Sequence, residues 1–184
     1  MVKKTSVGKK KTDDAKISRL ISDLGDPAIE VRHNAVDGLK KAGEPAVSPL
    51  IQMLEGATDN DARWYAAVAL GAIGAPAIAP LLAAMRENKD TDFRRYAAAS
   101  LGSMGVPAVE PLIAAMDSDE PVLRGFISQA LCRIGVPAVE PLTRRLGDDN
   151  EVLRTCASLT LWQMGETGLP AMVEKLKEED AERE

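Results

Sequence analysis

Five glycines recur at a nearly constant interval, and this interval constrains the fold more than any other feature of the chain. They are separated by 31, 31, 30 and 30 residues. A period of about 30 residues suits one helix–turn–helix unit, and self-similarity at such a period indicates a repeat architecture. The sequence therefore predicts five stacked pairs of helices. The recurring glycines are Gly43, Gly74, Gly105, Gly135 and Gly165.

The first element of each unit begins at an arginine eleven residues before the glycine. Counted from this arginine, apolar residues fall at positions −1, +3, +4, +7 and +10, which share one face of a helix. Small residues at +3 and +4 let neighbouring helices approach closely, and the closing glycine predicts a left-handed C-cap. In the third unit the apolar positions are Phe93, Ala97, Ala98, Leu101 and Met104.

A second element with two prolines follows four of the five glycines. Its sequence is PAVSPLIQML at 45–54, and similar segments occupy 76–85, 107–116 and 137–146. Proline suits the first turn of a helix because the missing N–H would have no partner there. Each element is too short to be stable alone, so the units must stack and bury one another's apolar faces.

These patterns predict an all-α fold, an α-solenoid (superhelix) of five helix–turn–helix repeats with a capping helix at each end. Residues 13–24 predict the N-terminal capping helix, and the charged segment 169–184 predicts the C-terminal cap. Residues 1–12 lack periodicity and predict a disordered basic tail before a single domain over 13–180. The repeats are expected at about 26–57, 58–88, 89–118, 119–147 and 148–178.

The net charge of −5 is unevenly distributed. Residues 1–16 contain six lysines and two aspartates, so they carry +4 and the rest of the chain carries −9. A body of this charge repels polyphosphate, which disfavours nucleic acid as its ligand. The basic segment is open to two interpretations: a solvated arm, or an electrostatic arm for an acidic partner or nucleic acid.

The sequence shows no secretory signal, because no apolar run follows the N-terminal lysines. The 22 uncharged residues between Arg63 and Arg86 are nominally long enough to span a bilayer, but Pro76 and Pro80 interrupt them. The two cysteines form no disulfide framework. We therefore expect a cytoplasmic protein without a membrane segment.

The repeat pattern D-x-x-V-R-x-x-A-A-x-A-L-G-x-I-G-x-P-A-V-x-P-L-I-x-A-L resembles the HEAT-like repeats of phycobilin lyases (PBS lyase HEAT-like repeats) and of many small prokaryotic HEAT proteins. It covers nearly everything from residue 13 onward. The resemblance implies that the arginine-bearing helix of each repeat lies on the inner, concave side. It also implies a structural ladder between turns, which we prefer to a phosphate site, formed by Asp26, Asp119 and Asp149 with Arg32, Arg63, Arg94, Arg124 and Arg154.

Three relatives with catalytic roles can be compared with these residues. Deoxyhypusine hydroxylases hold two iron atoms through His-Glu pairs, and the single histidine, His33, excludes such a site by ligand count. Alkylpurine DNA glycosylases need a basic channel, so the charge of the body disfavours that activity although Asp61, Trp64 and Tyr65 sketch a site. Phycobilin lyases share the repeat most closely, and an accessory subunit of such a lyase remains the alternative function.

The positions that the repeat leaves free point to a binding surface. On the arginine-bearing helices these positions hold five of the chain's six aromatic residues. Tyr65, Tyr96 and Phe126 share position +2 and predict a row across three neighbouring helices, although they could instead fill space between those helices. The predicted partner-binding residues are Trp64, Tyr65, Arg95, Tyr96, Phe126, Gln129, Arg133 and Trp162.

The functional prediction is a non-enzymatic scaffold that binds a protein or peptide on the concave face of the arginine-bearing helices. A ligand with acidic and apolar residues would suit this surface. No catalytic residues, metal ligands or cofactor are expected, because the sequence has no phosphate-binding loop, no metal-spaced cysteines and no nucleophile with histidine and carboxylate partners.

Overall fold

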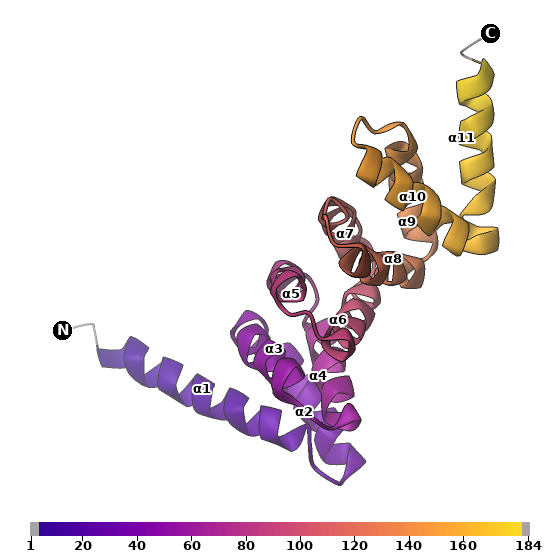
Figure 1. Ribbon diagram of the computed structural model, residues 1–184. Helices are drawn as coiled ribbons and strands as arrows, with labels where there is room; N and C mark the ends of the chain where they lie inside the picture. Colours follow the sequence, from indigo (N-terminus) through magenta and orange to yellow (C-terminus); the bar gives the residue numbers. More distant parts are fainter. Residues whose placement is uncertain (1–3, 182–184) are drawn as a thin grey trace. The chain divides into compact units, whose positions relative to one another are not determined.

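The computed structural model describes residues 4–181, with side chains described for residues 13–175, 177, 178 and 181. Within the described chain there are eleven α-helices, four short 3₁₀ segments and no β-strand, which confirms the predicted all-α fold (Figure 1). Two compact units, residues 1–84 and 85–184, divide the chain, and each is described by itself. The single domain over 13–180 and the five repeat boundaries stay predictions.

The first unit is built around α4, which packs against both α2 and α3. The helix α1 packs against α2 and α3 through residues that include the buried Ile17. The elements of this unit are α1 (Lys4–Asp23), α2 (Ile29–Ala42), η1 (Glu44–Ala46), α3 (Val47–Gly56), α4 (Asn60–Ile73) and most of α5 (Ala75–Glu87).

The N-terminal helix differs from the expectation for residues 1–12. The helix α1 begins at Lys4, so residues 4–12 are helical where the sequence analysis expects a disordered tail. Lysine, serine and threonine are compatible with a helix, no proline interrupts α1, and each residue added to an existing helix gains a hydrogen bond. Residues 1–3 of the predicted tail lie outside the described residues.

The second unit repeats one arrangement: α8 packs against α6 on one side and against α10 on the other, while α7 and α11 each pack against α9. We call α2, α4, α6, α8 and α10 the first helices, because each carries the recurring arginine. The elements of this unit are α6 (Thr91–Ser103), η2 (Val106–Ala108), α7 (Val109–Ala115), α8 (Pro121–Ile134), α9 (Val136–Arg144), η3 (Arg145–Gly147), α10 (Glu151–Gln163), η4 (Gly165–Thr167) and α11 (Leu169–Ala181).

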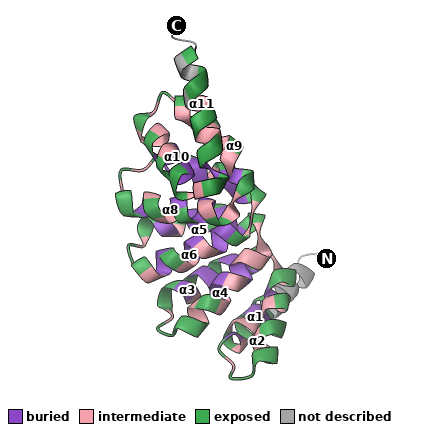
Figure 2. Ribbon diagram, turned by 90° about the vertical axis from the view of Figure 1, so that its right-hand side faces the viewer, coloured by how far each residue is buried: buried purple, intermediate pink, exposed green. Residues whose placement is uncertain are grey.

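The apolar positions predicted from the repeat form the core. In α6, Phe93, Ala97, Ala98 and Leu101 are buried, while Met104 just beyond the helix is half-buried. Figure 2 shows that buried positions lie along the sides where helices pack together and that most connecting turns are exposed. In α4 and α6 alanine occupies both +3 and +4, and such small side chains let neighbouring helices approach closely.

Four of the recurring glycines, Gly43, Gly74, Gly105 and Gly135, follow the first helices in a conformation other than the predicted αL cap. Gly74 has φ 78° and ψ −135°, and Gly105 has φ 69° and ψ −141°. The φ values are positive as predicted, whereas ψ is far from the αL value of about +47°. Positive φ with nearly extended ψ is almost restricted to glycine, so each position turns the chain sharply towards the second helix.

Candidate binding site on the first helices

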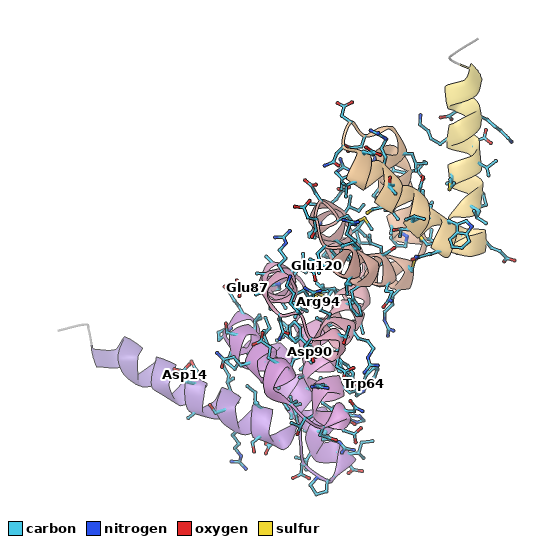
Figure 3. All side chains as sticks on the ribbon, viewed as in Figure 1. Asp14, Trp64, Glu87, Asp90, Arg94 and Glu120 are labelled. Atoms are coloured by element: carbon cyan, nitrogen blue, oxygen red, sulfur yellow. The ribbon has the colours of Figure 1, made fainter. Side chains whose placement is uncertain are left out.

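The recurring arginines hold the turns together, and Arg94 does so most completely. Its side chain is fully buried, and its Nε donates to the carbonyl oxygens of Met85 and Asn88 at 3.0 Å and 2.8 Å. Its two terminal nitrogens donate to both carboxylate oxygens of Glu120, at 2.6 Å and 3.0 Å (Figure 3). The bidentate pair joins the turn before α6 to the turn before α8.

The acidic partner differs from the one that the resemblance implies. Glu120, not its neighbour Asp119, receives the Arg94 guanidinium. Pro121 begins α8 and has no N–H to be capped, and Glu120 makes no side-chain cap, so its carboxylate is free to turn towards Arg94. Arg94 first and Lys89 second lower the pKa of Glu120 from the ordinary 4.5 to about 2.

Two other recurring arginines bond turn carbonyls, as predicted for a scaffold role. Arg124 donates to the carbonyl of Ser118, and Arg154 donates to the carbonyls of Asp148 and Asp149 at 2.6 Å and 3.0 Å. No anion is needed to explain their placement. The recurring arginines of the second unit are therefore structural groups and leave ligand binding to other positions.

The eight predicted binding residues fall into two groups by exposure. Trp64 and Trp162 are 48% and 63% exposed, which is unusual for indole side chains. Arg95, Gln129 and Arg133 are also exposed. The remaining three, which form the predicted row at position +2, are only half-buried and offer less surface: Tyr65, Tyr96 and Phe126.

The predicted row of aromatic residues is partly explained by contacts within the protein. The Tyr65 ring lies 4.8 Å from the Arg32 guanidinium carbon, and its centroid is 6.3 Å from that of His33, both on the neighbouring α2. Tyr65 thus fills space between two first helices. Tyr65 belongs to the first unit, and Tyr96 and Phe126 belong to the second, so the row across three helices stays a prediction.

A hollow of about 180 Å³ lies between α6 and α8, which we call the basic furrow. Ala98 and Ala99 form its α6 side, and Arg95 and Arg133 bring two guanidinium groups to it. Three of the predicted binding residues therefore meet in one place. The basic furrow is lined by Arg95, Ala98, Ala99, Gln129 and Arg133.

A second hollow of about 200 Å³ lies between α8 and α10, which we call the apolar furrow. It adjoins Leu159, which is 53% exposed, and opens where Gly125 has no side chain. The Thr160 hydroxyl donates to the Cys156 carbonyl at 2.7 Å and lies 2.6 Å from the Ser128 hydroxyl, so these polar groups are paired. The apolar furrow is lined by Met116, Pro121, Arg124, Gly125, Ser128, Cys156, Leu159, Thr160 and Gln163.

Sequence reasoning missed the apolar furrow although a signal was available. Gly125 and Leu159 occupy positions +1 and +5, which the repeat leaves free. A search of those positions for aromatic and polar residues overlooks glycine, yet a missing side chain is what opens a hollow. Leucine at a position that α6 and α8 fill with alanine and glutamine was the second signal.

No group of three or more His, Cys, Asp or Glu side chains among the described residues could hold a metal ion. Cys132 and Cys156 are free thiols, and burial raises the pKa of both. Among the described residues, no helix is both long and apolar enough to cross a bilayer.

The helical pairs and the turn geometry that recurs from repeat to repeat define an α-solenoid. The family model for HEAT repeats matches residues 17–102 and 109–184, and the PBS lyase HEAT-like repeat matches residues 93–118. The chain therefore belongs to the HEAT repeat family. No curated protein sequence matches it.

Solved structures resemble the chain in fold alone. A chain from the complex of CpcE and CpcF of phycocyanin lyase from Nostoc sp. PCC7120 is 24% identical, with 79% of this chain and 98% of that chain covered and a TM-score of 0.42. A designed armadillo repeat protein in complex with the peptide (KR)4 is 15% identical, with 89% and 91% covered and a TM-score of 0.35.

Proposed function

We propose that the protein is a non-enzymatic scaffold that binds a protein or peptide partner through the surface of its first helices. One observation carries the proposal: two tryptophans stand exposed at positions that the repeat does not require for folding. Trp64 is 48% exposed on α4 and Trp162 is 63% exposed on α10 (Figure 3 labels Trp64). Exposure of an indole ring to water is unfavourable. Covering the ring with a partner therefore contributes favourable free energy to binding.

The arrangement of the second unit also favours binding over catalysis. The two furrows are open and lie between neighbouring helices, and the polar groups that line them are guanidinium groups, the amides of Gln129 and Gln163, the Cys156 thiol and two hydroxyls within hydrogen-bond distance of each other. A catalytic site needs a nucleophile or a general base with a positioned partner. Two free cysteines suit the reducing cytoplasm that we propose as its compartment.

The test is partner capture with tryptophan variants. The tagged protein and its Trp64→Ser/Trp162→Ser variant are exposed to lysate, and the bound proteins are identified by mass spectrometry. We expect the variant to lose defined partners that the unchanged protein retains. Both changes are at exposed positions, so circular dichroism should show the same helix content and nearly the same melting temperature.

The matched control removes two exposed apolar side chains elsewhere. Val106 and Val136 are 66% and 73% exposed and lie outside the first helices. The variant Val106→Ser/Val136→Ser should retain every partner. Equal retention of partners by the tryptophan variant and the control would overturn the proposed binding surface.

The second candidate is an accessory subunit of a lyase-type enzyme. It is favoured by the match of residues 93–118 to the PBS lyase HEAT-like repeat. The test is to add a bilin to the purified protein and record the visible absorption spectrum. A saturable spectral change would favour this candidate. An unchanged spectrum would show that the protein does not bind the chromophore directly.

A further inference from the structure

The basic furrow and the apolar furrow are the same feature in successive repeats. Both lie between adjacent first helices, α6 and α8 for one and α8 and α10 for the other. Four of the five residues that line the basic furrow have a counterpart 30 residues later in the lining of the apolar furrow. At three of these positions the apolar furrow has an uncharged residue. Arg95 of the basic furrow corresponds to Gly125, Gln129 corresponds to Leu159, and Arg133 corresponds to Gln163.

The charge of the basic furrow runs against that of the unit that contains it. Residues 85–184 include twelve basic and eighteen acidic residues, a net charge of −6. The free positions +1, +2, +5, +8 and +9 of α6, α8 and α10 include Arg95 and Arg133 and no carboxylate at all. A positive site within an acidic unit attracts an anionic group and disfavours a cationic one.

Arg133 is held in place and remains available for a ligand. A Cβ on Gly102 would approach the Arg133 Cδ and Cβ to 2.8 Å and 2.9 Å, so the stem of Arg133 occupies the space that Gly102 leaves on α6. Among the side chains that the structure describes, none forms a hydrogen bond or ion pair with Arg133. Arg95 pairs with Asp92 at 2.8 Å, and both side chains are about half exposed.

The apolar furrow has the complementary character. Leu159 and Gly125 leave an exposed apolar surface, and the buried hydroxyls of Ser128 and Thr160 satisfy each other rather than seeking a ligand. An aliphatic side chain placed here would cover Leu159 without burying an unpaired hydroxyl, because Ser128 and Thr160 are already hydrogen-bonded. Such burial contributes about 25 cal/mol for each Å² of apolar surface removed from water.

The distance between the two furrows sets the spacing of their ligands. Neighbouring packed helices lie about 8–10 Å apart, so equivalent points on successive pairs are separated by about the same distance. A peptide in the polyproline II conformation has three residues per turn and advances about 3.1 Å per residue, so side chains three residues apart project to the same side and span this step. A peptide crossing α8 can place one side chain in each furrow.

We propose that the second unit binds a peptide in the polyproline II conformation whose acidic side chain enters the basic furrow while an apolar side chain three residues away enters the apolar furrow. This inference rests on the proposed scaffold function and adds the chemical class and spacing of the ligand. The guanidinium of Arg133, with Arg95 beside it, binds the ligand carboxylate, and Leu159 contacts the apolar residue. The main chain of the peptide crosses α8 near Gly125 and Gln129.

The test uses synthetic dodecapeptides with a Gly/Ser background, one Glu and one Leu. The separation of Glu and Leu varies from one to six residues in both orders, and a parallel series has Lys in place of Glu. Binding to the full chain is measured by fluorescence anisotropy. We expect the tightest binding at a separation of three and binding about tenfold weaker when Lys replaces Glu.

Two variants take their new residue from positions that the same fold already accepts. Arg133→Gln installs the residue of the equivalent position 163, and Leu159→Gln installs that of the equivalent position 129. Arg133→Gln should remove the preference for Glu over Lys, and Leu159→Gln should remove the dependence on Leu. The control Arg144→Gln makes the same charge change on α9, and its binding should be unchanged.

The outcomes separate this inference from the scaffold proposal. Binding without preference for charge or spacing, or unchanged binding by Arg133→Gln and Leu159→Gln, would overturn the inference and leave the scaffold intact. Absence of binding by every peptide also overturns the inference. The scaffold proposal fails independently, by the capture experiment with Trp64 and Trp162.

Discussion

The junction between α6 and α8 and the junction between α8 and α10 are built from equivalent positions but are stabilised by different forces. At the first, Arg94 and Glu120 form a bidentate ion pair, and Arg133 packs over Gly102. At the second, Ser128 and Thr160 share a buried hydrogen bond, and Asn150 donates to Asp117 at 3.0 Å.

The difference shows how a repeat protein varies its surface without changing its fold. Each junction needs close helix packing and satisfied polar groups, and either a bidentate ion pair or hydrogen bonds without a cationic partner meet that need. The furrow above each junction has the same character as the contacts near it, basic in one case and neutral in the other. The following predictions separate the two junctions by experiment.

The largest expected effect is on the ionic junction. Arg94→Ala removes a fully buried side chain and leaves the carbonyls of Met85 and Asn88 without their donor. We expect a loss of about 3 kcal/mol in the free energy of unfolding, measured by urea denaturation. The equivalent Arg124→Ala should cost only about 1 kcal/mol, because half-buried Arg124 donates to the Ser118 carbonyl alone. Equal losses would show that the two junctions do not differ in this way.

Acid should weaken the ionic junction through Glu120. The pKa of Glu120 is about 2 in the folded protein and 4.5 ordinarily, so the folded state binds the proton less tightly than the unfolded state. The stabilisation is therefore complete above about pH 4.5 and is lost as the pH falls towards 2. Glu120→Gln should be less stable at neutral pH and lose less stability over this range than the unchanged protein. Urea midpoints recorded from pH 6 to pH 2 measure both effects.

A matched control keeps this pH test specific. Glu174→Gln makes the same charge change on the exposed surface of α11. Its stability should follow the unchanged protein across the whole pH range. A flattened profile for Glu174→Gln as well would attribute the acid effect to net charge and not to the Arg94 pair.

The sequence predicts the scaffold of both junctions because the repeat dictates it. Glycine follows each first helix, the small residues Ala98, Ser128 and Ser158 at +4 let the helices approach closely, and arginine bonds the turn. It does not predict the partner of Arg94, since the choice of Glu120 over Asp119 depends on the turn and on the proline that follows it. Turn geometry at single-residue precision is not encoded in the repeat pattern.

The candidate site was predictable where it depends on side chains and not where it depends on their absence. Arg95, Gln129 and Arg133 were predicted as variable polar residues, and they line one furrow. The apolar furrow depends on Gly125, and a hollow becomes visible only when its walls are in place. The backbone angle ψ of the capping glycines could likewise not be predicted, because the repeat pattern indicates only that φ is positive.

Glycine distinguishes the two junctions at the next level of magnitude. Gly102→Ala would crowd Arg133 and approach the Ala130 carbonyl oxygen to 3.1 Å, and we expect it to destabilise the protein by about 1–2 kcal/mol. Gly125→Ala is the control, because a Cβ there meets nothing within 4 Å and alanine favours the helix by about 1 kcal/mol. Thermal denaturation should thus show opposite changes in melting temperature. If both variants changed the melting temperature in the same direction, helix propensity would have a larger effect on stability than the packing of Arg133 against Gly102.

The smallest effect is expected at the neutral junction. The Ser128 and Thr160 hydroxyl oxygens lie 2.6 Å apart and either can be the donor, while Thr160 also contacts the Cys156 carbonyl and Ser128 contacts Gln163 Oε1 at 3.1 Å. Ser128→Ala should cost about 1 kcal/mol because Thr160 stays buried with one bond fewer. Ser128→Ala/Thr160→Val removes both polar groups, and we expect it to be at least as stable as Ser128→Ala. A double variant with the summed cost of both single changes would show that the hydroxyls act independently and that packing alone joins α8 to α10.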